Sequence, residues 1–415
     1  MKVFKFGGAS VKDAEGVKNV ANLLQKVGYD DVLIVISAMG KMTNAFEKIV
    51  EAYHQKKKEL PLYINEVRNF HYTIIDQLFS KGHKVYDDVE MLFMSMTGFI
   101  IKNKSTDFDY VYDQIVSYAE LISTKIVSHY LTEQNIKNNW IDVRDFIITD
   151  SFYREGKVNW VKTERNITEK ILPNNLYITQ GFIAKDAHGN TTTLGREGSD
   201  YSAAIFTYLL DAENLTIWKD VPGVLNADPR YFKESQLLHR MSYAEAIELA
   251  FYGASVIHPK TLQPLQRKKI PLLVKSFLRP EETGTIIIDN ALIEPYVPCF
   301  IVKKEQILLS ISSLDFSFIV EQNISEIFGL LHQYKMKVNL IQNSAISFSV
   351  CIEDKYLKIN ALLSELKTKF GVEMFENATL FTIRHFNDKA IETIEKHNKV
   401  LLKQMAKETV QIVIQ

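Results

Sequence analysis

Short apolar strands alternate with amphipathic helices along this chain, and this alternation restricts the fold more than any other feature. Residues 1–6 and 31–37 have the apolar, β-branched character of buried strands, and residues 14–26 between them have helical periodicity. Further strands are predicted at residues 140–143, 176–182, 215–218 and 270–276. The pattern predicts a three-layer α/β/α sandwich, in which helices cover both faces of a mainly parallel sheet.

Two long segments between these strands have helical character. Residues 43–104 are rich in helical periodicity and are expected to form an excursion from the sheet. Residues 109–131 are predicted to form one long helix. Ser242 and Glu245 have the spacing of a capping box, which predicts the start of a helix that ends near Gly253.

A break in composition at residues 280–298, which carry Pro295 and Pro298, predicts a domain boundary. The residues after it read as a strand, a helix, a hairpin, a helix and a strand, which is a ferredoxin-like βαββαβ unit. The order starts again with a strand at 379–385, but the chain stops before a second helix and a fourth strand. The expected domains are residues 1–295 and 296–415, and the second comprises one unit at about 305–376 and a truncated copy at about 377–415.

Composition and charge exclude several classes of protein. The net charge is −1, so no overall field favours nucleic acid or an anionic membrane surface. Cys299 and Cys351 form neither a disulfide framework nor a metal-ligand spacing, as in proteins of a reducing cytosol. The longest apolar stretch, residues 91–101, is too short to span a bilayer, and the N-terminus begins with a strand rather than a secretory signal. We therefore expect a cytoplasmic protein.

The most informative motif is TTLGREGSDYSAA at residues 192–204. Gly195 and Gly198 flank an Arg-Glu pair, and an apolar helical pattern follows Ser199 and Asp200. A glycine-rich loop that opens a helix presents backbone N–H groups and the positive end of the helix dipole. Arg196 adds a planar guanidinium suited to a carboxylate or a phosphate. The motif predicts a site where a small anionic substrate is held against a phosphoryl donor.

Two other loops follow predicted strands. In KFGGAS, glycines would let a phosphate approach the backbone and Lys5 would place positive charge on it. This loop is neither a Walker A motif nor a GxGxxG fingerprint, and on local grounds a plain structural turn is the more common interpretation. In SAMGKMTN, Thr43 either lines a ligand site at the end of a strand or caps the next helix, and both roles can hold together.

Three further features have a functional and a structural interpretation. Glu120 shares a helical face with apolar and small residues, so it either binds something polar or forms an internal salt bridge. Lys219, Asp220 and Arg230 in WKDVPGVLNADPR either bracket a nucleotide or belong to a plain turn. His258 has no second histidine at ligand spacing and no partnered nucleophile, so a structural role is favoured.

Taken in order, these motifs resemble those of aspartate kinases, which belong to the amino-acid kinase superfamily. The motifs are KFGGAS, SAMGKMTN, AEL around Glu120, GFIAKD, TTLGREGSDYSAA, WKDVPGVLNADPR and ELAFYGASVIHPKT. The resemblance covers nearly the whole chain, because the tail after about residue 300 is similar to the ACT regulatory region of that family. It implies ATP-dependent phosphorylation of the side-chain carboxylate of L-aspartate to 4-phospho-L-aspartate, the first step of lysine, threonine and methionine biosynthesis.

The resemblance also implies roles for individual residues, with ATP and Mg²⁺ as cofactors. The catalytic residues would be Lys5 and Asp200. The nucleotide would be bound by Lys5, Phe6, Gly7, Gly8, Lys219, Asp220, Leu225, Arg230 and Ser255. L-aspartate would be bound by Ser37, Thr43, Glu120, Arg196, Glu197, Gly198 and Ser199. The chain departs from many relatives at Lys219, Leu225 and Ser255. Many relatives have a lysine in place of Ser255, and Lys219 or Lys260 is hypothesised to bind the phosphate here instead.

The chemistry of the reaction agrees with this set of residues. An aspartate side chain has a pKa of about 3.9, so the nucleophile is ionised at neutral pH and needs no general base. Catalysis should rest on positioning and on positive charge. Two alternatives remain, a kinase for glutamate or an N-acylated amino acid and a non-catalytic amino-acid sensor. Glu120 argues against an N-acylated substrate, which has no ammonium to pair.

Regulation is less determined by the sequence. At the places where feedback-inhibited relatives bind an amino-acid effector, this chain has residues 321–324, Asn339 and Ala345. Inhibition by lysine or threonine is therefore expected to be weak, altered or absent. An exposed ferredoxin-like sheet edge favours a homodimer or higher homo-oligomer. The chain is also expected to be monofunctional, without a fused homoserine dehydrogenase domain.

Overall fold

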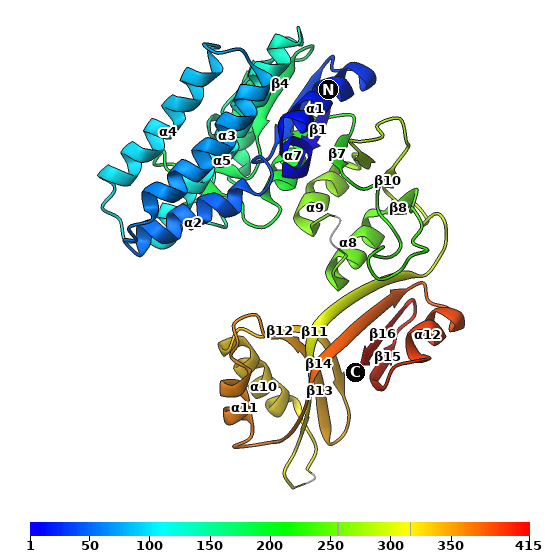
Figure 1. The fold of residues 1–415 in the computed structure, drawn as a ribbon. Coiled ribbons are helices and arrows are strands. Elements are labelled where there is room, and N and C mark those ends of the chain that lie inside the picture. The colour runs from blue at the N-terminus through cyan, green and yellow to red at the C-terminus, as the bar shows by residue number, and fades with distance from the viewer. Residues whose placement is uncertain (255–256, 316) are drawn as a thin grey trace. The chain divides into compact units, whose positions relative to one another are not determined.

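The computed structural model describes residues 1–254, 257–315 and 317–415, which form two compact units (Figure 1). The first unit contains Met1–Val224, Leu237–Ile247 and Val256–Ile293. The second contains Leu225–Gln236, Glu248–Ser255 and Glu294–Gln415. In the described part of the chain, no helix is long and apolar enough to cross a membrane.

An eight-stranded sheet forms the centre of the first unit. Its strands, in spatial order, are β3 (Asn139–Trp140), β4 (Leu176–Gln180), β2 (Val32–Ile36), β1 (Lys2–Phe6), β7 (Leu215–Lys219), β9 (Leu272–Ser276), β10 (Thr285–Ile288) and β8 (Arg240–Ser242). All neighbours are parallel except β9 and β10. The mainly parallel sheet is therefore confirmed. The strand predicted at 140–143 is shorter, because Val143–Asp145 turn into a 3₁₀ helix.

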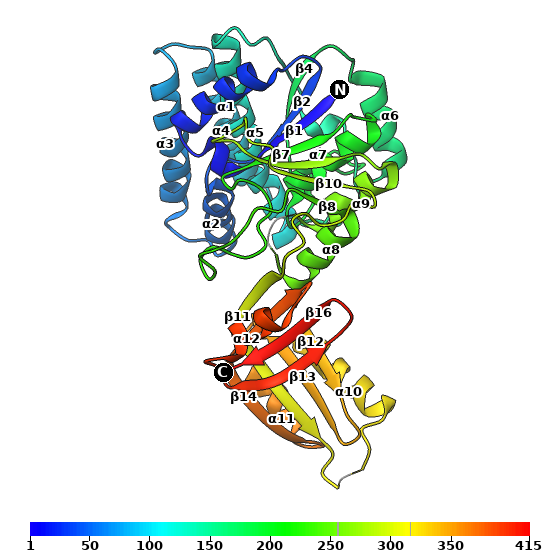
Figure 2. The ribbon, with the colours of Figure 1, turned by 90° about the vertical axis from the view of Figure 1, so that its right-hand side faces the viewer.

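Helices cover both faces of this sheet, as the two ribbon views show (Figure 2). On one face, one apolar core joins the sheet to α1 (Ala14–Val27), α2 (Met42–His54), α3 (Leu60–Leu78), α4 (Val85–Lys102) and α5 (Phe108–Glu133). The other face carries α7 (Gly198–Leu209), which packs against α6 (Trp160–Lys170) and α9 (Pro259–Lys268). A small hairpin of β5 (Ile183–Lys185) and β6 (Thr191–Thr193) precedes α7. The helical excursion and the single long helix are as predicted. Helix α8 (Tyr243–Tyr252) begins directly after Ser242, whose hydroxyl accepts from the Glu245 N–H.

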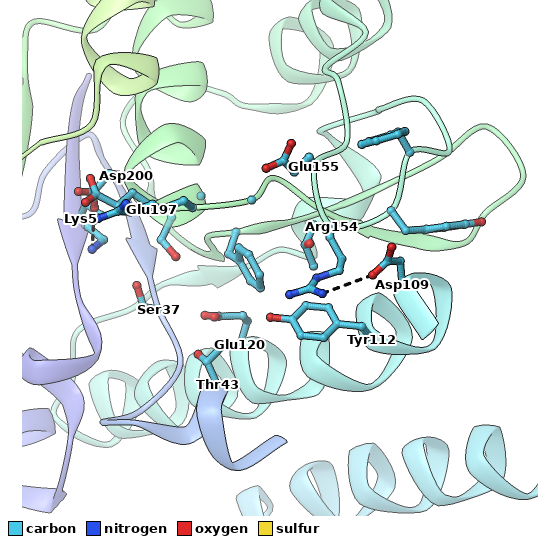
Figure 3. Close-up of a pocket in the computed structure, with 18 of the residues that line it drawn as sticks. Lys5, Ser37, Thr43, Asp109, Tyr112, Glu120, Arg154, Glu155, Glu197 and Asp200 are labelled. Atoms are coloured by element: carbon cyan, nitrogen blue, oxygen red, sulfur yellow. Dashed lines mark hydrogen bonds and ion pairs between the residues drawn. The ribbon is translucent and has the colours of Figure 1, made fainter. Parts of the chain in front are cut away.

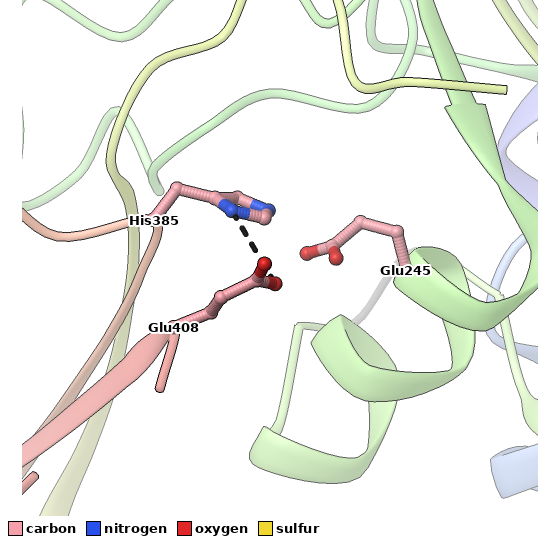
Figure 4. Close-up of side chains that lie close together, drawn as sticks. All are labelled: Glu245, His385 and Glu408. Carbon is pink, nitrogen blue, oxygen red and sulfur yellow. Dashed lines mark ion pairs between the residues drawn. The ribbon is translucent and has the colours of Figure 1, made fainter. Parts of the chain in front are cut away.

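A six-stranded antiparallel sheet organises the second unit. Its order is β12 (Lys337–Asn343), β13 (Ser347–Glu353), β11 (Cys299–Ser312), β14 (Gly371–Arg384), β16 (Thr409–Ile414) and β15 (Val400–Met405). The helices are α10 (Glu321–Gln333), α11 (Ile359–Leu366) and α12 (Asp388–Glu395). At the end of β14, His385 forms an ion pair of 3.9 Å with Glu408 (Figure 4). The neighbouring Arg384 donates to the Thr409 hydroxyl at 2.9 Å.

Two expectations about the second unit are wrong. The strands predicted at 372–375 and 379–385 are the two halves of one strand, β14. The copy at 377–415 does not lack a fourth strand, because the first half of β11, Cys299–Lys303, pairs with Leu380–Arg384 of β14. This gives the strand order β15, β16, β14, β11 around the second copy. A strand contributed from before the first copy cannot be recognised by reading the repeat in sequence order.

His71 is a titratable group enclosed in the helical core. It is 0% exposed and its Nδ1 donates to the Val67 carbonyl at 2.7 Å, while the rings of Phe46, Phe70 and Phe93 contact it edge-on. Burial lowers the pKa of His71 from 6.5 to about 4, because the enclosure disfavours the charged imidazolium. The imidazole is neutral in the folded protein at neutral pH.

This burial makes the protein sensitive to acid. Between pH 6.5 and pH 4 the unfolded chain binds a proton at His71 and the folded chain does not, so the free energy of unfolding should fall as the pH falls, by about 3 kcal/mol in total. The His71→Phe variant lacks this proton. Its Tm, measured by calorimetry, should decline less than that of the parent between pH 6.5 and pH 4. A difference in Tm that is constant over this range would contradict the prediction.

Candidate active site

A cavity of about 780 Å³ opens in the first unit at the carboxyl ends of β1, β2, β4 and β7 (Figure 3). Ligands of open α/β sheets bind at this edge. The residues that line the cavity are Lys5, Ser37, Thr43, Asp109, Tyr112, Glu120, Phe152, Tyr153, Arg154, Glu155, Phe182, Thr193, Gly195, Arg196, Glu197, Gly198, Ser199, Asp200 and Lys219.

A buried ion pair joins the central strand to the helix behind the cavity. Lys5 Nζ, near the end of β1, lies 2.7 Å from Asp200 Oδ1 in the first turn of α7, and both residues are buried. A Cβ atom on Gly7 would lie 3.3 Å from this ammonium, which is therefore held beneath the glycine loop. The arrangement fixes one positive charge where a phosphate can approach the backbone N–H groups of the loop.

Two glycines allow close backbone approaches beside the cavity. A Cβ on Gly8 would lie 2.5 Å from the Gly40 carbonyl oxygen, and the Gly40 N–H donates to Gly8 at 3.0 Å. A Cβ on Gly181 would lie 2.5 Å from the Cβ of Ser199, so the end of β4 can meet the first turn of α7 only without a side chain. These contacts bring the loops after β1, β2 and β4 together around the site.

Glu120 projects from α5 into the cavity and is only 2% exposed. Its Oε2 is buried and has no hydrogen-bond partner among the described residues. Burial raises the pKa of Glu120 to about 8, while the Ala38 N–H and the charge of Lys5 lower it. Since Glu120 forms no ion pair within the part of the chain that the structure describes, the alternative of an internal salt bridge is not what is found. At neutral pH the carboxyl group is therefore mostly protonated in the free protein, and a cation or donor from a ligand would favour its ionised form.

The loop after β6 turns sharply into α7. Glu197 occupies the N-cap position with a left-handed backbone (φ 53°) and no side-chain capping bond. The helix begins at Gly198 and carries Asp200 in its first turn, as expected of a loop that exposes a helix N-terminus. Arg196 is exposed at the rim of the cavity, and Ser199 is half-buried in it.

The structure brings all seven predicted substrate residues together. Ser37, Thr43, Glu120, Arg196, Glu197, Gly198 and Ser199 all line the same cavity as Lys5, Asp200 and Lys219. Thr43 is the second residue of α2, whose N-cap is Lys41, so its alternative interpretation as a helix cap is wrong.

The predicted nucleotide residues are less concentrated. Phe6 is buried and stacks on Trp218, while Asp220 is exposed after β7. Leu225 and Arg230 belong to the second unit, where Arg230 pairs with Asp228 at 2.6 Å. Ser255 lies outside the described residues.

His258 has the structural role that its isolation in the sequence favours. It is the N-cap of α9, and its Nδ1 accepts from the Lys260 N–H at 3.2 Å. Burial lowers the pKa of His258, which agrees with a neutral imidazole acting as an acceptor.

Nine residues that line the cavity were given no site role from the sequence, although the last three of them lie in the motifs GFIAKD and TTLGREGSDYSAA: Asp109, Tyr112, Phe152, Tyr153, Arg154, Glu155, Phe182, Thr193 and Gly195. Asp109 and Tyr112 lie 11 and 8 residues before Glu120 on the predicted helix, so helical spacing could have placed them on its face. The residues from 152 to 155 lie in an irregular segment that has no periodicity to read.

This fold and site define the class of protein: the chain belongs to the amino acid kinase family, whose profile matches residues 1–276. Within that family it belongs with the aspartokinases. It is 30% identical to lysine-sensitive aspartokinase 3 of Escherichia coli over 391 residues, which cover 92% of this chain and 86% of the relative. It is 28% identical to the chloroplastic bifunctional aspartokinase/homoserine dehydrogenase 2 of Arabidopsis thaliana, of which it spans 42%.

Solved structures give the same family. The crystal structure of E. coli aspartokinase III in complex with lysine and aspartate matches with a TM-score of 0.83 at 28% identity and covers 100% of this chain and 95% of that one. The structure of the same enzyme with aspartate and ADP matches with a TM-score of 0.80 at 27% identity and covers 100% of this chain and 96% of that one.

The unsatisfied carboxylate makes the free protein less stable in alkaline solution. The folded pKa of Glu120, about 8, lies above its ordinary value of 4.5, so the free energy of unfolding should fall as the pH rises between these values. The Glu120→Gln variant avoids this loss, which is on the order of 4 kcal/mol. Without ligand, its Tm should exceed that of the parent at pH 8 and approach it at pH 5. An equal difference at both pH values would exclude this origin.

Proposed function

We propose that the first unit transfers the γ-phosphoryl group of ATP to the side-chain carboxylate of L-aspartate and forms 4-phospho-L-aspartate, which begins the biosynthesis of lysine, threonine and methionine. The observation that carries this proposal is the buried, unpartnered Oε2 of Glu120 in the cavity that also contains the Lys5–Asp200 pair. An amino-acid ammonium satisfies Glu120, and an acidic side chain can then face Lys5. The E. coli relative, whose structures contain aspartate and ADP, supports the same choice of ligands.

The substrate carboxylate is the nucleophile. It is ionised at neutral pH, so the protein has to bring two anions together rather than remove a proton. Lys5 neutralises the transferring phosphoryl group, and Asp200 keeps Lys5 in place. The uncapped N–H groups at the start of α7 and the guanidinium of Arg196 add positive potential on the same side of the cavity.

Aspartate is recognised by groups that match its three charges. Glu120 pairs with the ammonium, which favours the ionised form of its carboxyl group, and Arg196 pairs with a carboxylate. The hydroxyl groups of Ser37, Thr43 and Ser199 line the cavity and complete the hydrogen bonds. An N-acylated amino acid has no ammonium and would leave Glu120 unsatisfied.

The nucleotide is bound from the ends of β1 and β7. Gly7 and Gly8 receive the phosphates, while Lys219 ends the neighbouring strand β7 and Asp220 follows it. On the resemblance to aspartate kinases, Leu225, Arg230 and Ser255 are also proposed to bind the nucleotide. Many relatives have a lysine at the position of Ser255, and in this chain Lys219 or Lys260 is proposed to bind the phosphate instead. Mg²⁺ supplies charge neutralisation on the phosphates when bound. Carboxylate oxygens of Asp200 and the buried, unpartnered Oε2 of Glu197 fit its preference for oxygen ligands.

The second unit serves regulation and assembly in this proposal. We place the catalytic domain at residues 1–295 and the ACT-type region at 296–415, which joins two chains into a homodimer. Asn339 is already engaged inside the sheet, because its Oδ1 accepts from Lys303 Nζ at 2.8 Å and its Nδ2 donates to Gln306 at 2.7 Å. A neutral amide engaged in this way offers no charge to an effector ammonium, so inhibition by lysine or threonine is expected to be weak, altered or absent.

The direct test is an acyl-phosphate assay. Purified protein with Mg²⁺-ATP and hydroxylamine should form the hydroxamate from L-aspartate and not from L-glutamate or N-acetyl-L-aspartate. N-acetyl-L-aspartate has no ammonium to pair with Glu120, and L-glutamate tests whether the site distinguishes the two acidic amino acids. Hydroxamate from glutamate alone would assign another amino-acid kinase activity. Failure with all three acceptors would favour a non-catalytic sensor.

Kinetics of two variants separate the roles of Lys5 and Glu120. Lys5→Ala should lower kcat on the order of 10²–10³-fold, since it removes charge stabilisation from the phosphoryl group. Glu120→Ala should mainly raise the KM for aspartate. Lys2→Ala, which removes a lysine from the same strand outside the cavity, is the matched control and should leave both constants unchanged. Near-normal kcat in Lys5→Ala would remove the role assigned to this lysine.

A further inference from the structure

Asp113 is a buried acidic residue with no role in the phosphoryl transfer itself. It is 0% exposed on α5, seven residues before Glu120, so the two carboxylates project from the same face of the helix two turns apart. Unlike Glu120, Asp113 is fully engaged in hydrogen bonds to the protein. Burial raises its pKa to about 6, against the lowering effect of those bonds.

The carboxylate of Asp113 ties two segments of the cavity wall to α5. Its Oδ2 accepts from the Arg154 N–H at 2.9 Å and from the Thr193 N–H at 2.8 Å. Its Oδ1 accepts from the Thr193 hydroxyl at 2.8 Å. Thr193 directly precedes the substrate loop, residues 194–197, and Arg154 lies in residues 151–156, which we call the rim loop. The two loops also meet directly, because the Gly156 N–H donates to the Thr193 carbonyl at 2.8 Å.

The bond from Asp113 fixes an uncommon backbone conformation. Arg154 has a φ of 68°, in the left-handed region that residues with a Cβ rarely adopt. Such a conformation persists where the surroundings determine it, and such positions gather at functional sites. Here it places an arginine side chain on the wall of the cavity.

The guanidinium of Arg154 is held against the Tyr112 ring and forms only an exposed ion pair with Asp109. Its Cζ lies 4.3 Å from the centre of the Tyr112 ring, and its ion pair with Asp109 is 3.4 Å long between side chains that are about half exposed (Figure 3). Stacking on the ring holds the planar group in place. An exposed ion pair contributes little, so a ligand carboxylate can replace Asp109 at small cost. Figure 3 shows Glu120 drawn between this guanidinium and the Lys5–Asp200 pair.

We propose that Asp113 is a positioning residue of the substrate site: by fixing the rim loop against the substrate loop, it presents Arg154 as a second cation for a dicarboxylate amino acid. The inference rests on the proposed phosphorylation of aspartate and adds a residue that favours a dianionic substrate. Aspartate carries two carboxylates, and a cavity lined by Arg196, Arg154 and Lys5 can balance both of them together with the phosphates.

The experiment compares Asp113→Ala, Asp113→Asn, Arg154→Met and the double variant Asp113→Ala/Arg154→Met. An asparagine can keep the three contacts, since its carbonyl oxygen accepts from both N–H groups and its amide donates to the Thr193 hydroxyl. Asp113→Ala and Arg154→Met should each raise the KM for aspartate on the order of tenfold, with the KM for ATP unchanged. Asp113→Asn should restore most of the affinity, and the double variant should lose no more than either single variant.

Several results would overturn the proposal. An unchanged KM for aspartate in Arg154→Met would overturn it, even if Asp113→Ala does not fold. If the increases in the KM for aspartate add in the double variant, Asp113 does not act through Arg154. Ile75→Ala, a truncation in the core of α3 away from the cavity, controls for reduced stability and should leave the KM unchanged. If the parent protein forms no hydroxamate from aspartate, the proposed function itself is wrong. The activity of the parent protein therefore separates this outcome from a failure of the role proposed for Asp113.

Discussion

The buried ion pair between Lys5 and Asp200 is the interaction on which the rest of the site depends. It joins the middle of the sheet to the first turn of α7, so it fixes the helix N-terminus relative to the glycine loop after β1. Removing one partner of a buried pair leaves an uncompensated charge, whereas the intact pair is a fixed dipole. The same pair therefore holds the anion-binding end of α7 in place and keeps an ammonium beside it, before any substrate is present.

Glu120 shows the opposite arrangement of a buried charge. Oε2 of its carboxyl group has no hydrogen-bond partner among the described residues, and its raised pKa reflects the unfavourable free energy of ionising the buried group. A fully paired glutamate would stabilise the free protein and could not bind a ligand. Asp113, two turns earlier on α5, has every oxygen engaged and serves the architecture. Helix α5 thus carries one carboxyl group, Glu120, that is available to bind a ligand, and another, Asp113, that fixes the loops lining the cavity.

Much of the first unit could be predicted from the sequence because its determinants are local. Strand and helix periodicities lie within single segments, and glycine loops at strand ends signal where a ligand binds. The residues from Arg196 to Asp200 and Glu120 were found in this way. Arg154 and Asp113 were not predicted, because their role depends on hydrogen bonds between residues 41 and 80 positions apart in the sequence. Neither segment has a sequence pattern that predicts its contact with the other.

The second unit shows the same limit on a larger scale. Its two halves were recognised as copies of one motif, yet each long strand, β11 and β14, belongs to both halves and continues through an irregular register near Gln306. Two four-stranded units that share strands in this way form one continuous six-stranded sheet. Because β11 and β14 pair with each other and with strands of both halves, the region is one sheet rather than one complete unit followed by a remnant. Only the missing fourth strand is a consequence of chain order, since the strand that completes the second half precedes the first, whereas α12 is the one helix described in residues 377–415, as predicted.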